Sequence, residues 1–275
     1  MAHPEFTFLF ARQRSGTNAL RSIVGTNPDI ACFTEVFKPE ERESPDPLKR
    51  ASNYFTFLPQ YCAGDVTRAF PDRVDTLFDD YLAYLRPLAA KPLKVLDVKY
   101  NSTHHITGTW RAIAEPTLFS LVKAREHAVL HLVRRNYLRS LLSHLKAWES
   151  KRYYKYDPSP EADTRVMVYT DWAIPEMERW RAEDDLVAAA FEGHAHYLRL
   201  EYDDLFPDAT GAMAADSLEQ MRAWFGVPDV FSNHATLFKQ SSLPLADTIA
   251  NFDEVREALT GTRFAYCLDD EGAYR

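Results

Sequence analysis

The first polar turn of the chain carries the residue types best suited to bind an anion. An apolar run at 6–11 is followed by the turn RQRSGTN at 12–18 and then by a helical pattern. Backbone N–H groups at the start of a helix have no intrahelical partner, and Gly16 lets a ligand approach the backbone closely. Side-chain charge and hydrogen bonds come from Arg14, Ser15, Thr17 and Asn18. The turn is therefore predicted to hold a phosphate; the alternative is a polar loop that only caps the helix.

This turn is not a Walker A loop. That motif, GxxxxGK[ST], needs a first glycine that Ala11 and its neighbours do not provide, and a lysine where Thr17 follows Gly16. Hydrolysis of a nucleoside triphosphate and a P-loop kinase activity are therefore disfavoured.

Composition limits the other classes of function. The 275 residues are 46% hydrophobic and carry a net charge of -8, which argues against a general nucleic-acid binder. The cysteines are far apart and form no CxxC pair, so neither a disulfide framework nor a metal site is predicted: Cys32, Cys62 and Cys267. With no signal-peptide pattern and no apolar run near the ~20 residues of a membrane span, the sequence predicts a soluble cytoplasmic protein.

The elements that must position this turn alternate in type along the chain. Short apolar runs predict strands at 6–11, 29–33, 93–100, 128–135 and 196–202. Amphipathic patterns predict helices at 17–26, 73–88, 103–113, 136–149, 168–192, 212–225 and 252–260. This alternation is typical of an α/β fold with a central, mainly parallel sheet of about five strands covered by helices on both faces. We expect a single domain over 1–275.

Two stretches do not fit the alternating pattern. Residues 38–62 carry prolines, mixed charges and then aromatic residues, and residues 151–165 place the sequence KRYYKY before a proline-rich turn. Loops of this length in a compact domain are usually functional. Both are predicted to be loops on the acceptor side of the site.

The turn at 12–18 resembles the 5'-phosphosulfate loop of the sulfotransferases that use PAPS (3'-phosphoadenosine-5'-phosphosulfate). In that family an apolar strand is followed by a basic residue, then by Ser or Thr, then by Gly, and then by two more residues with hydroxyl groups. The sequence RSGT at 14–17 matches the first four of these positions. Gln13 stands where the family has proline, and Asn18 where it has Thr or Ser. The resemblance implies a P-loop-like three-layer fold and PAPS as co-substrate, with PAP as product and no metal.

A second family element should hold the 3'-phosphate of PAPS. The family uses an Arg at a strand end and a Ser eight residues later on the following helix, and Arg135 and Ser143 match this spacing. Arg134 and Arg139 lie in the same segment, so which arginine holds the 3'-phosphate stays open.

Two later segments also resemble the family. In LRLEYDDLFPD, Tyr202 matches a position near the adenine, although a Tyr packed at a strand end explains it equally well. Close to the C-terminus, Lys239 and Ser241 match nucleotide contacts of bacterial sulfotransferases.

Sulfuryl transfer needs cations around the leaving phosphate and a base for the acceptor proton. Arg14 is the first predicted cation. Lys99 ends the strand at 93–100, where open α/β sheets place ligand contacts. The resemblance gives this Lys a role at the sulfonate, and the alternative is a solvated Lys at a strand end.

Glu35 is the predicted general base. Small-molecule sulfotransferases of the cytosol carry a His two residues after the strand-end Lys, but this position is Asn101. Protein-tyrosine and bacterial glycolipid sulfotransferases use a Glu, and Glu35 aligns with it without a gap. A carboxylate can do this if burial raises its pKa or if the proton moves late in a loose transition state. Alternatively Glu35 pairs with Arg12 or Arg14, and His104 or His105 is the base.

These residues predict transfer of a sulfuryl group from PAPS to a hydroxyl of a carbohydrate, glycolipid or small metabolite. The alternatives are a protein-tyrosine sulfotransferase and a non-catalytic PAP-binding module. Acceptor contacts are predicted at His104 and Tyr153, and the neighbouring tyrosines could stack on a sugar, an aromatic metabolite or a peptide. No nucleic-acid partner is expected, and a homodimer is left open.

Overall fold

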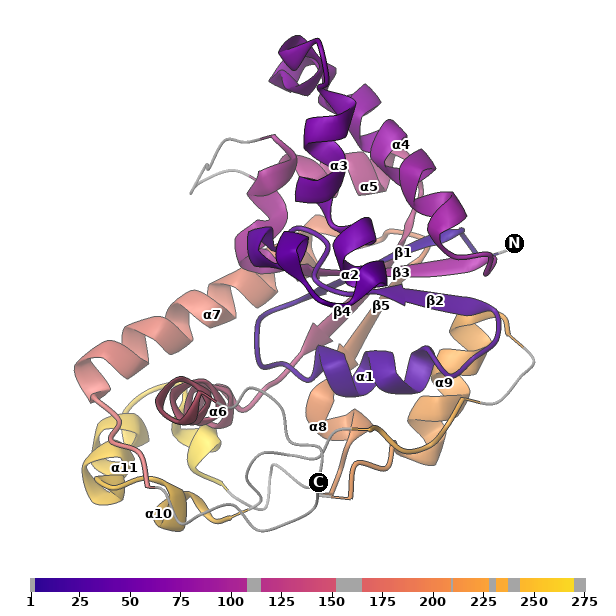
Figure 1. Cartoon of the computed structure of the whole chain (residues 1–275). Coiled ribbons are helices and arrows are strands. Elements are labelled where there is room, and N and C mark those ends of the chain that lie inside the picture. The colour runs from indigo at the N-terminus through magenta and orange to yellow at the C-terminus, as the bar shows by residue number, and fades with distance from the viewer. Residues whose placement is uncertain are drawn as a thin grey trace.

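A five-stranded parallel sheet forms the centre of the computed structural model, which describes residues 3–107, 115–151, 165–208, 210–227, 231–236 and 243–269. The strands are β1 (Phe6–Ala11), β2 (Ile30–Phe33), β3 (Leu93–Lys99), β4 (Ala128–Val133) and β5 (Tyr197–Glu201). They are parallel in the order β2-β3-β1-β4-β5 (Figure 1). The predicted α/β fold with its parallel sheet is confirmed.

Helices connect and cover these strands. The α-helices are α1 (Thr17–Val24), α2 (Pro47–Ser52), α3 (Tyr54–Tyr61), α4 (Val74–Leu85), α5 (Thr117–Ala124), α6 (Tyr137–Ser150), α7 (Thr170–Ala190), α8 (Tyr202–Leu205), α9 (Ala215–Phe225), α10 (Leu245–Thr248) and α11 (Phe252–Thr260). Short 3-10 helices are η1 (Pro39–Glu43), η2 (Val66–Ala69), η3 (Pro71–Arg73), η4 (Arg86–Leu88), η5 (Tyr100–Ile106) and η6 (Ala265–Leu268).

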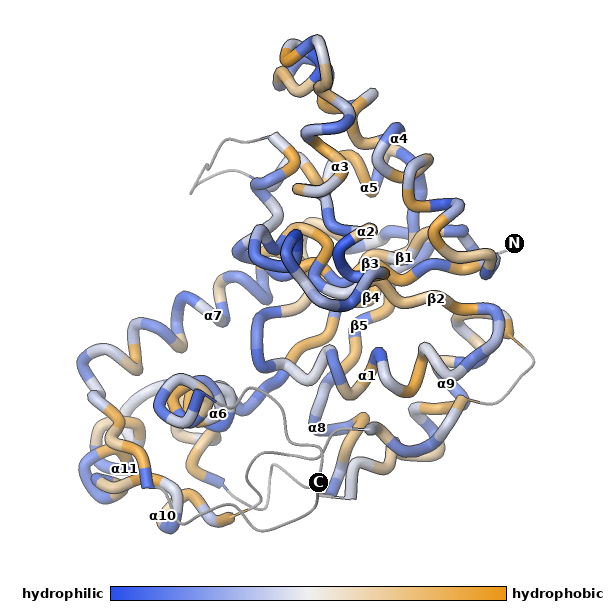
Figure 2. The backbone as a smooth tube through the Cα atoms, viewed as in Figure 1, coloured by the Kyte–Doolittle hydropathy of each residue, from blue (hydrophilic) through white to orange (hydrophobic). Residues whose placement is uncertain are grey.

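The two faces of the sheet bury separate hydrophobic clusters. Every residue of β1 is buried, and alternate side chains of the strand point to opposite faces. Phe6, Phe8 and Phe10 pack with residues of α3, α4 and α5, while Leu9 and Ala11 pack with residues of α1, α8 and α9. Figure 2 shows hydrophobic residues concentrated along the strands and alternating with polar ones in the helices. The fold therefore has three layers.

A third cluster lies beside the sheet and holds α6 in place. It joins residues of α6 and α7 to residues of α10, α11 and η6. This cluster positions the start of α6 next to the carboxyl end of β4.

The strand order places one loop at a favourable point for a ligand. From β1 the chain moves outward to β2, returns to β3, and then crosses to β4 on the other side of β1. In open α/β sheets, ligands bind outside the carboxyl ends of the strands where the order reverses in this way. The turn after β1 lies at that point.

Some predicted elements differ from the observed ones. The stretch 38–62, predicted to be a loop, contains η1, α2 and α3. Pro47 lies in the first turn of α2, where proline is favourable because its missing N–H would be unpaired anyway. The helix predicted at 103–113 is instead η5 up to Ile106, followed by residues outside the described ranges, and α5 was not predicted.

Within the described residues, no helix is long and apolar enough to cross a bilayer.

His131 is expected to make the fold less stable in mild acid. It lies in β4, fully buried, with Nε2 and Nδ1 each 2.7 Å from a hydroxyl oxygen, of Tyr100 and Tyr197 respectively. Burial lowers the pKa of His131 to about 3, so the folded protein keeps the ring neutral. The unfolded chain binds this proton below pH ~6.5. Stability therefore falls as the pH drops from there toward 3, by up to ~1.4 kcal/mol per pH unit for this group.

Chemical denaturation at several pH values between ~5 and ~6.5 checks this expectation. The control is His131→Gln, because its amide can donate to one neighbour and accept from the other without titrating. We expect a flatter dependence on pH in the variant, and equal slopes for the two proteins would contradict the assignment.

Candidate active site at the carboxyl end of the sheet

The turn between β1 and α1, residues 12–18, is called the phosphate turn below. Its backbone is left-handed at Arg14, where φ is 67°, and at Gly16, where φ is 89°. Gly16 is the N-cap of α1, and no side chain caps the helix there. The first N–H groups of α1 consequently have no intrahelical partner, and the positive end of the helix dipole favours an anion beside them.

A buried hydroxyl in the phosphate turn lacks a partner. The Oγ atom of Ser15 makes no hydrogen bond within the described part of the chain, and the residue is 1% exposed. An unsatisfied buried polar group costs ~1–3 kcal/mol, so an oxygen of a bound phosphate or sulfonate would satisfy it. This observation fits an anion with several oxygen atoms in the turn.

Lys99 and the phosphate turn are held together by a buried network of charges. Lys99 Nζ donates to Thr17 Oγ1 at 2.5 Å and pairs with Asp97 at 2.8 Å. The other oxygen of Asp97 lies 3.1 Å from Arg21 Nε, and Arg21 also donates to Thr34 and Asn18. Lys99 is only 4% exposed, so the alternative of a solvated lysine is wrong. Asp97 holds the ammonium group against the N-terminus of α1.

The two predicted phosphate elements meet through Arg14 and Ser143. The guanidinium of Arg14 donates from Nε at 3.1 Å and from Nη2 at 3.0 Å to the hydroxyl of Ser143 on α6. These residues are 129 positions apart in the sequence. The contact therefore brings the phosphate turn and the middle of α6 to one site.

The arginines near the start of α6 have different partners. Arg135 is 51% exposed in its side chain and pairs with Asp204 at 2.5 Å. Arg139 donates to the carbonyl of Leu243 at 2.8 Å. Arg134 donates to the carbonyl oxygen of Arg14 at 3.5 Å and so contacts the phosphate turn. The structure leaves open which of them holds the 3'-phosphate.

Tyr202 packs directly against the phosphate turn. It begins α8 and is 7% exposed, and a Cβ atom added to Gly16 would lie 2.2 Å from two ring carbons of Tyr202. The guanidinium of Arg134 lies 5.0 Å from the ring centroid. Only glycine fits at position 16 with this ring in place. A role for Tyr202 at the adenine stays a prediction.

Glu35 lies just beyond the end of β2, in a strained conformation. Its φ is 38°, and its side chain is 13% exposed and pairs with Lys38 at 3.1 Å, not with Arg12 or Arg14. Left-handed backbone at a non-glycine residue is often retained at functional sites.

The pKa of Glu35 differs from the expectation that burial raises it. Burial alone would raise the pKa, but the positive charges of Lys99 and Lys38 outweigh it, and the pKa lies below its ordinary value. A raised pKa is the first of the two conditions under which a carboxylate could be the base, and it is not met because Glu35 is buried near cations. Glu35 is therefore ionised at neutral pH, and only the alternative of late proton transfer is left for a base of this kind.

His104 and His105 remain the other candidates for the base. Both lie in η5, with ring centroids 4.1 Å apart, and the ring of His105 packs edge-on against Phe55 of α3. Burial lowers the pKa of each, so both are neutral at pH 7 and able to accept a proton.

The predicted contacts Lys239, Ser241 and Tyr153 lie outside the described residues.

Sequence reasoning missed the acids that hold the site's cations. Asp97 lies two residues before Lys99 in β3, and residues two apart on a strand share a face, so a buried charge pair could have been predicted there. Asp184 of α7, which pairs with Arg12 at 3.3 Å, gives no such local signal because the pair spans 172 positions.

The described residues contain no group of His, Cys, Asp and Glu side chains able to hold a metal ion.

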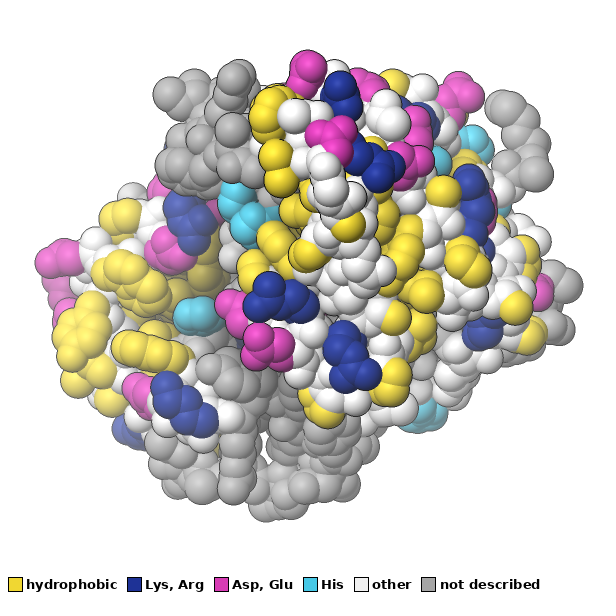
Figure 3. Space-filling model, turned by 45° about the horizontal axis from the view of Figure 1, so that its top comes forward, with side chains coloured by type: hydrophobic (Ala, Val, Ile, Leu, Met, Phe, Trp, Pro, Cys, Tyr) yellow, Lys and Arg dark blue, Asp and Glu magenta, His cyan; other side chains and the backbone are white. Residues whose placement is uncertain are grey.

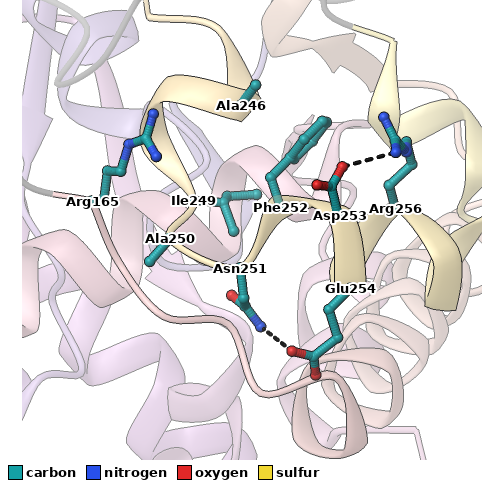
Figure 4. Close-up of a pocket in the computed structure, with 9 residues that line it drawn as sticks. All are labelled: Arg165, Ala246, Ile249, Ala250, Asn251, Phe252, Asp253, Glu254 and Arg256. Carbon is teal, nitrogen blue, oxygen red and sulfur yellow. Dashed lines mark hydrogen bonds and ion pairs between the residues drawn. The ribbon is translucent and has the colours of Figure 1, made fainter.

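A cavity of about 400 Å³ lies at the junction of α10 and α11, beyond α6 from α1 (Figures 1 and 4). Four of its polar side chains form two pairs, Asp253 with Arg256 at 2.8 Å and Asn251 with Glu254 at 2.9 Å, and Arg165 pairs with Asp247 at 3.8 Å. The phosphate turn is therefore the better candidate for an anionic ligand.

The chain is similar to known proteins over nearly its whole length. No family model matches it. It is 26% identical over 278 residues to nodulation protein H of Rhizobium tropici, and the alignment covers 98% of this chain and 96% of that protein. It is also similar to the crystal structure of a sulfotransferase from Alicyclobacillus acidocaldarius, with a TM-score of 0.47 and 13% identity over 100% of this chain and 95% of that one.

Proposed function

We infer that this chain belongs to the sulfotransferase family, because its motifs resemble those of the family and its relatives support the assignment. On that premise we propose that it transfers a sulfuryl group from PAPS to an acceptor hydroxyl. Sulfuryl transfer resembles phosphoryl transfer, in which positioning and charge stabilisation supply most of the catalysis. The residues around the phosphate turn are of the kinds that such a reaction needs.

The contact between Arg14 and Ser143 is the observation that carries the proposal. The sequence predicts one of these residues at the 5'-phosphosulfate and the other at the 3'-phosphate of the same nucleotide. The hydrogen-bonded contact between them supports the proposal that one ligand of PAPS size reaches both elements. Two unrelated phosphate-like motifs would have no reason to meet.

Arg14 and Lys99 are proposed to stabilise the charge that develops on the leaving phosphate and the sulfonate. Arg14 stays charged at any physiological pH and can bind two oxygen atoms at once. Lys99 is already fixed at the N-terminus of α1 by Thr17 and Asp97, so little reorganisation is needed when charge develops nearby. Ser15 and the first N–H groups of α1 complete the anion site.

Glu35 is proposed to accept the proton of the acceptor hydroxyl. Its carboxylate is ionised, and the positive charge of Lys99 is one of the causes that lower its pKa, which supports a position near the proposed sulfonate site. A weak base suffices if the proton leaves late, after the sulfur–oxygen bond to the leaving phosphate has lengthened.

The acceptor is proposed to be a carbohydrate, a glycolipid or a small metabolite. On the described part of the face in Figure 3, acidic and basic side chains lie beside one another and form no large patch of one sign. Charge on this face therefore lends no support to an acidic peptide as acceptor. The segment with the sequence KRYYKY, at 151–156, lies largely outside the described residues.

Transfer of labelled sulfate from PAPS, screened against acceptors of these classes, tests the proposal. We expect PAP to be formed in step with a labelled product, without added metal. Binding of PAP with no transfer to any acceptor would favour a non-catalytic PAP-binding module, and failure to bind PAP would reject the nucleotide site.

Arg135→Ala is expected to weaken PAP binding by ~1.5–3 kcal/mol, the worth of a hydrogen bond to a charged group. Arg135 is paired with Asp204 in the structure, so a 3'-phosphate has to replace that carboxylate. The matched variant Asp204→Asn should therefore bind PAP at least as tightly as the wild type. Calorimetric titration measures both, and unchanged affinity in Arg135→Ala would move the role to Arg134 or Arg139.

A further inference from the structure

Asp184 is a buried acid on α7 that none of the steps above uses. It is 2% exposed, and its two oxygen atoms accept hydrogen bonds from three different parts of the chain. Oδ2 accepts from Tyr137 at 2.8 Å and from Arg12 at 3.3 Å, and Oδ1 accepts from Tyr100 at 2.8 Å. One carboxylate thus joins the end of β1, the end of β3 and the start of α6.

Each partner of Asp184 adjoins a residue proposed to act on PAPS. Tyr100 directly follows Lys99, Tyr137 is the first residue of the helix that carries Ser143, and Arg12 is the first residue of the phosphate turn. A movement of Asp184 would therefore displace Lys99, the phosphate turn and the proposed 3'-phosphate element at the same time.

The hydrogen bonds around Asp184 have a fixed direction. A carboxylate only accepts, so the hydroxyl of Tyr100 donates to Asp184 and must accept from Nε2–H of His131. Nδ1 of His131 then accepts from the hydroxyl of Tyr197 on β5. Burial raises the pKa of Tyr100 well above its ordinary value, which keeps this hydroxyl protonated as the chain of bonds requires.

Asp184 also compensates a buried positive charge. The guanidinium of Arg12 lies 4.7 Å from the ring centroid of Trp180 and 5.1 Å from that of Tyr137, and it donates to the carbonyl of Trp180 at 3.3 Å. Asp184 is the carboxylate with which this buried guanidinium forms an ion pair in the described part of the chain. Removing one partner of a buried pair leaves an uncompensated charge.

We propose that Asp184 is a positioning residue, which sets the placement of Lys99, the phosphate turn and the start of α6 relative to one another so that both ends of one nucleotide are held at once. This inference rests on the proposed function. It assigns α7, whose sequence carries no family motif, a part in organising the site.

Single hydroxyl deletions separate this role from plain stabilisation. Tyr100→Phe should lower kcat at least about fivefold with little change in the KM for PAPS, because it loosens the position of Lys99. Tyr137→Phe should raise the KM for PAPS and the Kd for PAP about fivefold with little change in kcat. Tyr197→Phe is the matched control, since it removes a tyrosine hydroxyl of the same network without touching Asp184. Both constants should stay within about twofold of the wild type.

Hydrogen exchange gives a readout that does not depend on activity. In Asp184→Asn we expect the backbone amides of the phosphate turn and of the first turn of α6 to exchange faster than in Tyr197→Phe. If both phenylalanine variants at 100 and 137 only lower the melting temperature and leave kcat, KM and the Kd for PAP unchanged, the inference is overturned. If the wild type neither binds PAP nor transfers sulfate, the proposed function fails instead, and the exchange experiment alone decides the role of Asp184.

Discussion

Glu35→Gln is expected to abolish sulfate transfer while leaving the affinity for PAP nearly unchanged. The amide has the size and shape of the carboxylate but cannot take up the proton of the acceptor hydroxyl. General base catalysis contributes ~10²–10⁴-fold to the rate. The nucleotide is proposed to be held by the phosphate turn and α6, neither of which contains Glu35. Initial rates with labelled PAPS and a calorimetric titration with PAP measure the two quantities.

Glu41→Gln is the matched control for this experiment. Glu41 pairs with the same lysine, Lys38, at 3.3 Å, and its side chain is 15% exposed compared with 13% for Glu35. Both variants remove one negative charge from the same cluster. If Glu41→Gln slows transfer as much as Glu35→Gln does, the effect belongs to the cluster of charges and Glu35 is not the base.

The dependence of kcat on pH separates Glu35 from the histidines. A base must be deprotonated to act, and the pKa of Glu35 is held below its ordinary value, so the carboxylate should be fully active from pH ~6 upward. A histidine base would lose activity as the pH falls through its pKa, which burial lowers from 6.5 for both His104 and His105. Two results together would assign the base to these histidines. One is that Glu35→Gln retains activity, and the other is that the decrease of kcat at acidic pH disappears in the double variant His104→Asn/His105→Asn.

The sheet could be predicted because its signals are local. Each strand was predicted from a short apolar run, and β1 is buried along its whole length, as expected for a parallel strand that is covered on both faces. The helices α2 and α3 were missed because their signals depend on position within the helix. Pro47 and the capping residues Asp46 and Asn53 look like a loop in the sequence, yet they begin two helices.

The candidate site could be predicted in its parts but not in its contacts. The types and spacing of Arg14, Lys99 and Ser143 indicated an anion site, and the structure brings them near the end of β1. The sequence could not indicate that Arg135 would pair with an acid on α8, or that cations would lower the pKa of Glu35. Both depend on side chains that only the tertiary fold brings together.

Gly16→Ala is expected to destroy nucleotide binding and to destabilise the protein strongly. The new Cβ would lie 2.2 Å from Cδ2 and Cε2 of Tyr202, and the φ of 89° is unfavourable for any residue with a Cβ. Left-handed backbone costs ~1–2 kcal/mol and overpacking a further ~1–3 kcal/mol. The ring cannot move aside cheaply, because Tyr202 is buried beneath Arg134. The phosphate turn must therefore shift, and its amides would no longer meet the phosphate.

Gly226→Ala isolates the cost of the backbone alone, because Gly226 has a φ of 66° and no described atom lies within 4 Å of its added Cβ. It should lose only the ~1–2 kcal/mol of left-handed strain and bind PAP normally. The clash itself is measured by a double-mutant cycle of Gly16→Ala with Tyr202→Ala, read by denaturant unfolding. Removing the ring should make the alanine at position 16 less costly by ~0.5–3 kcal/mol. Strict additivity of the two substitutions would mean that the turn does not pack on Tyr202, and the glycine would then be required for its φ alone.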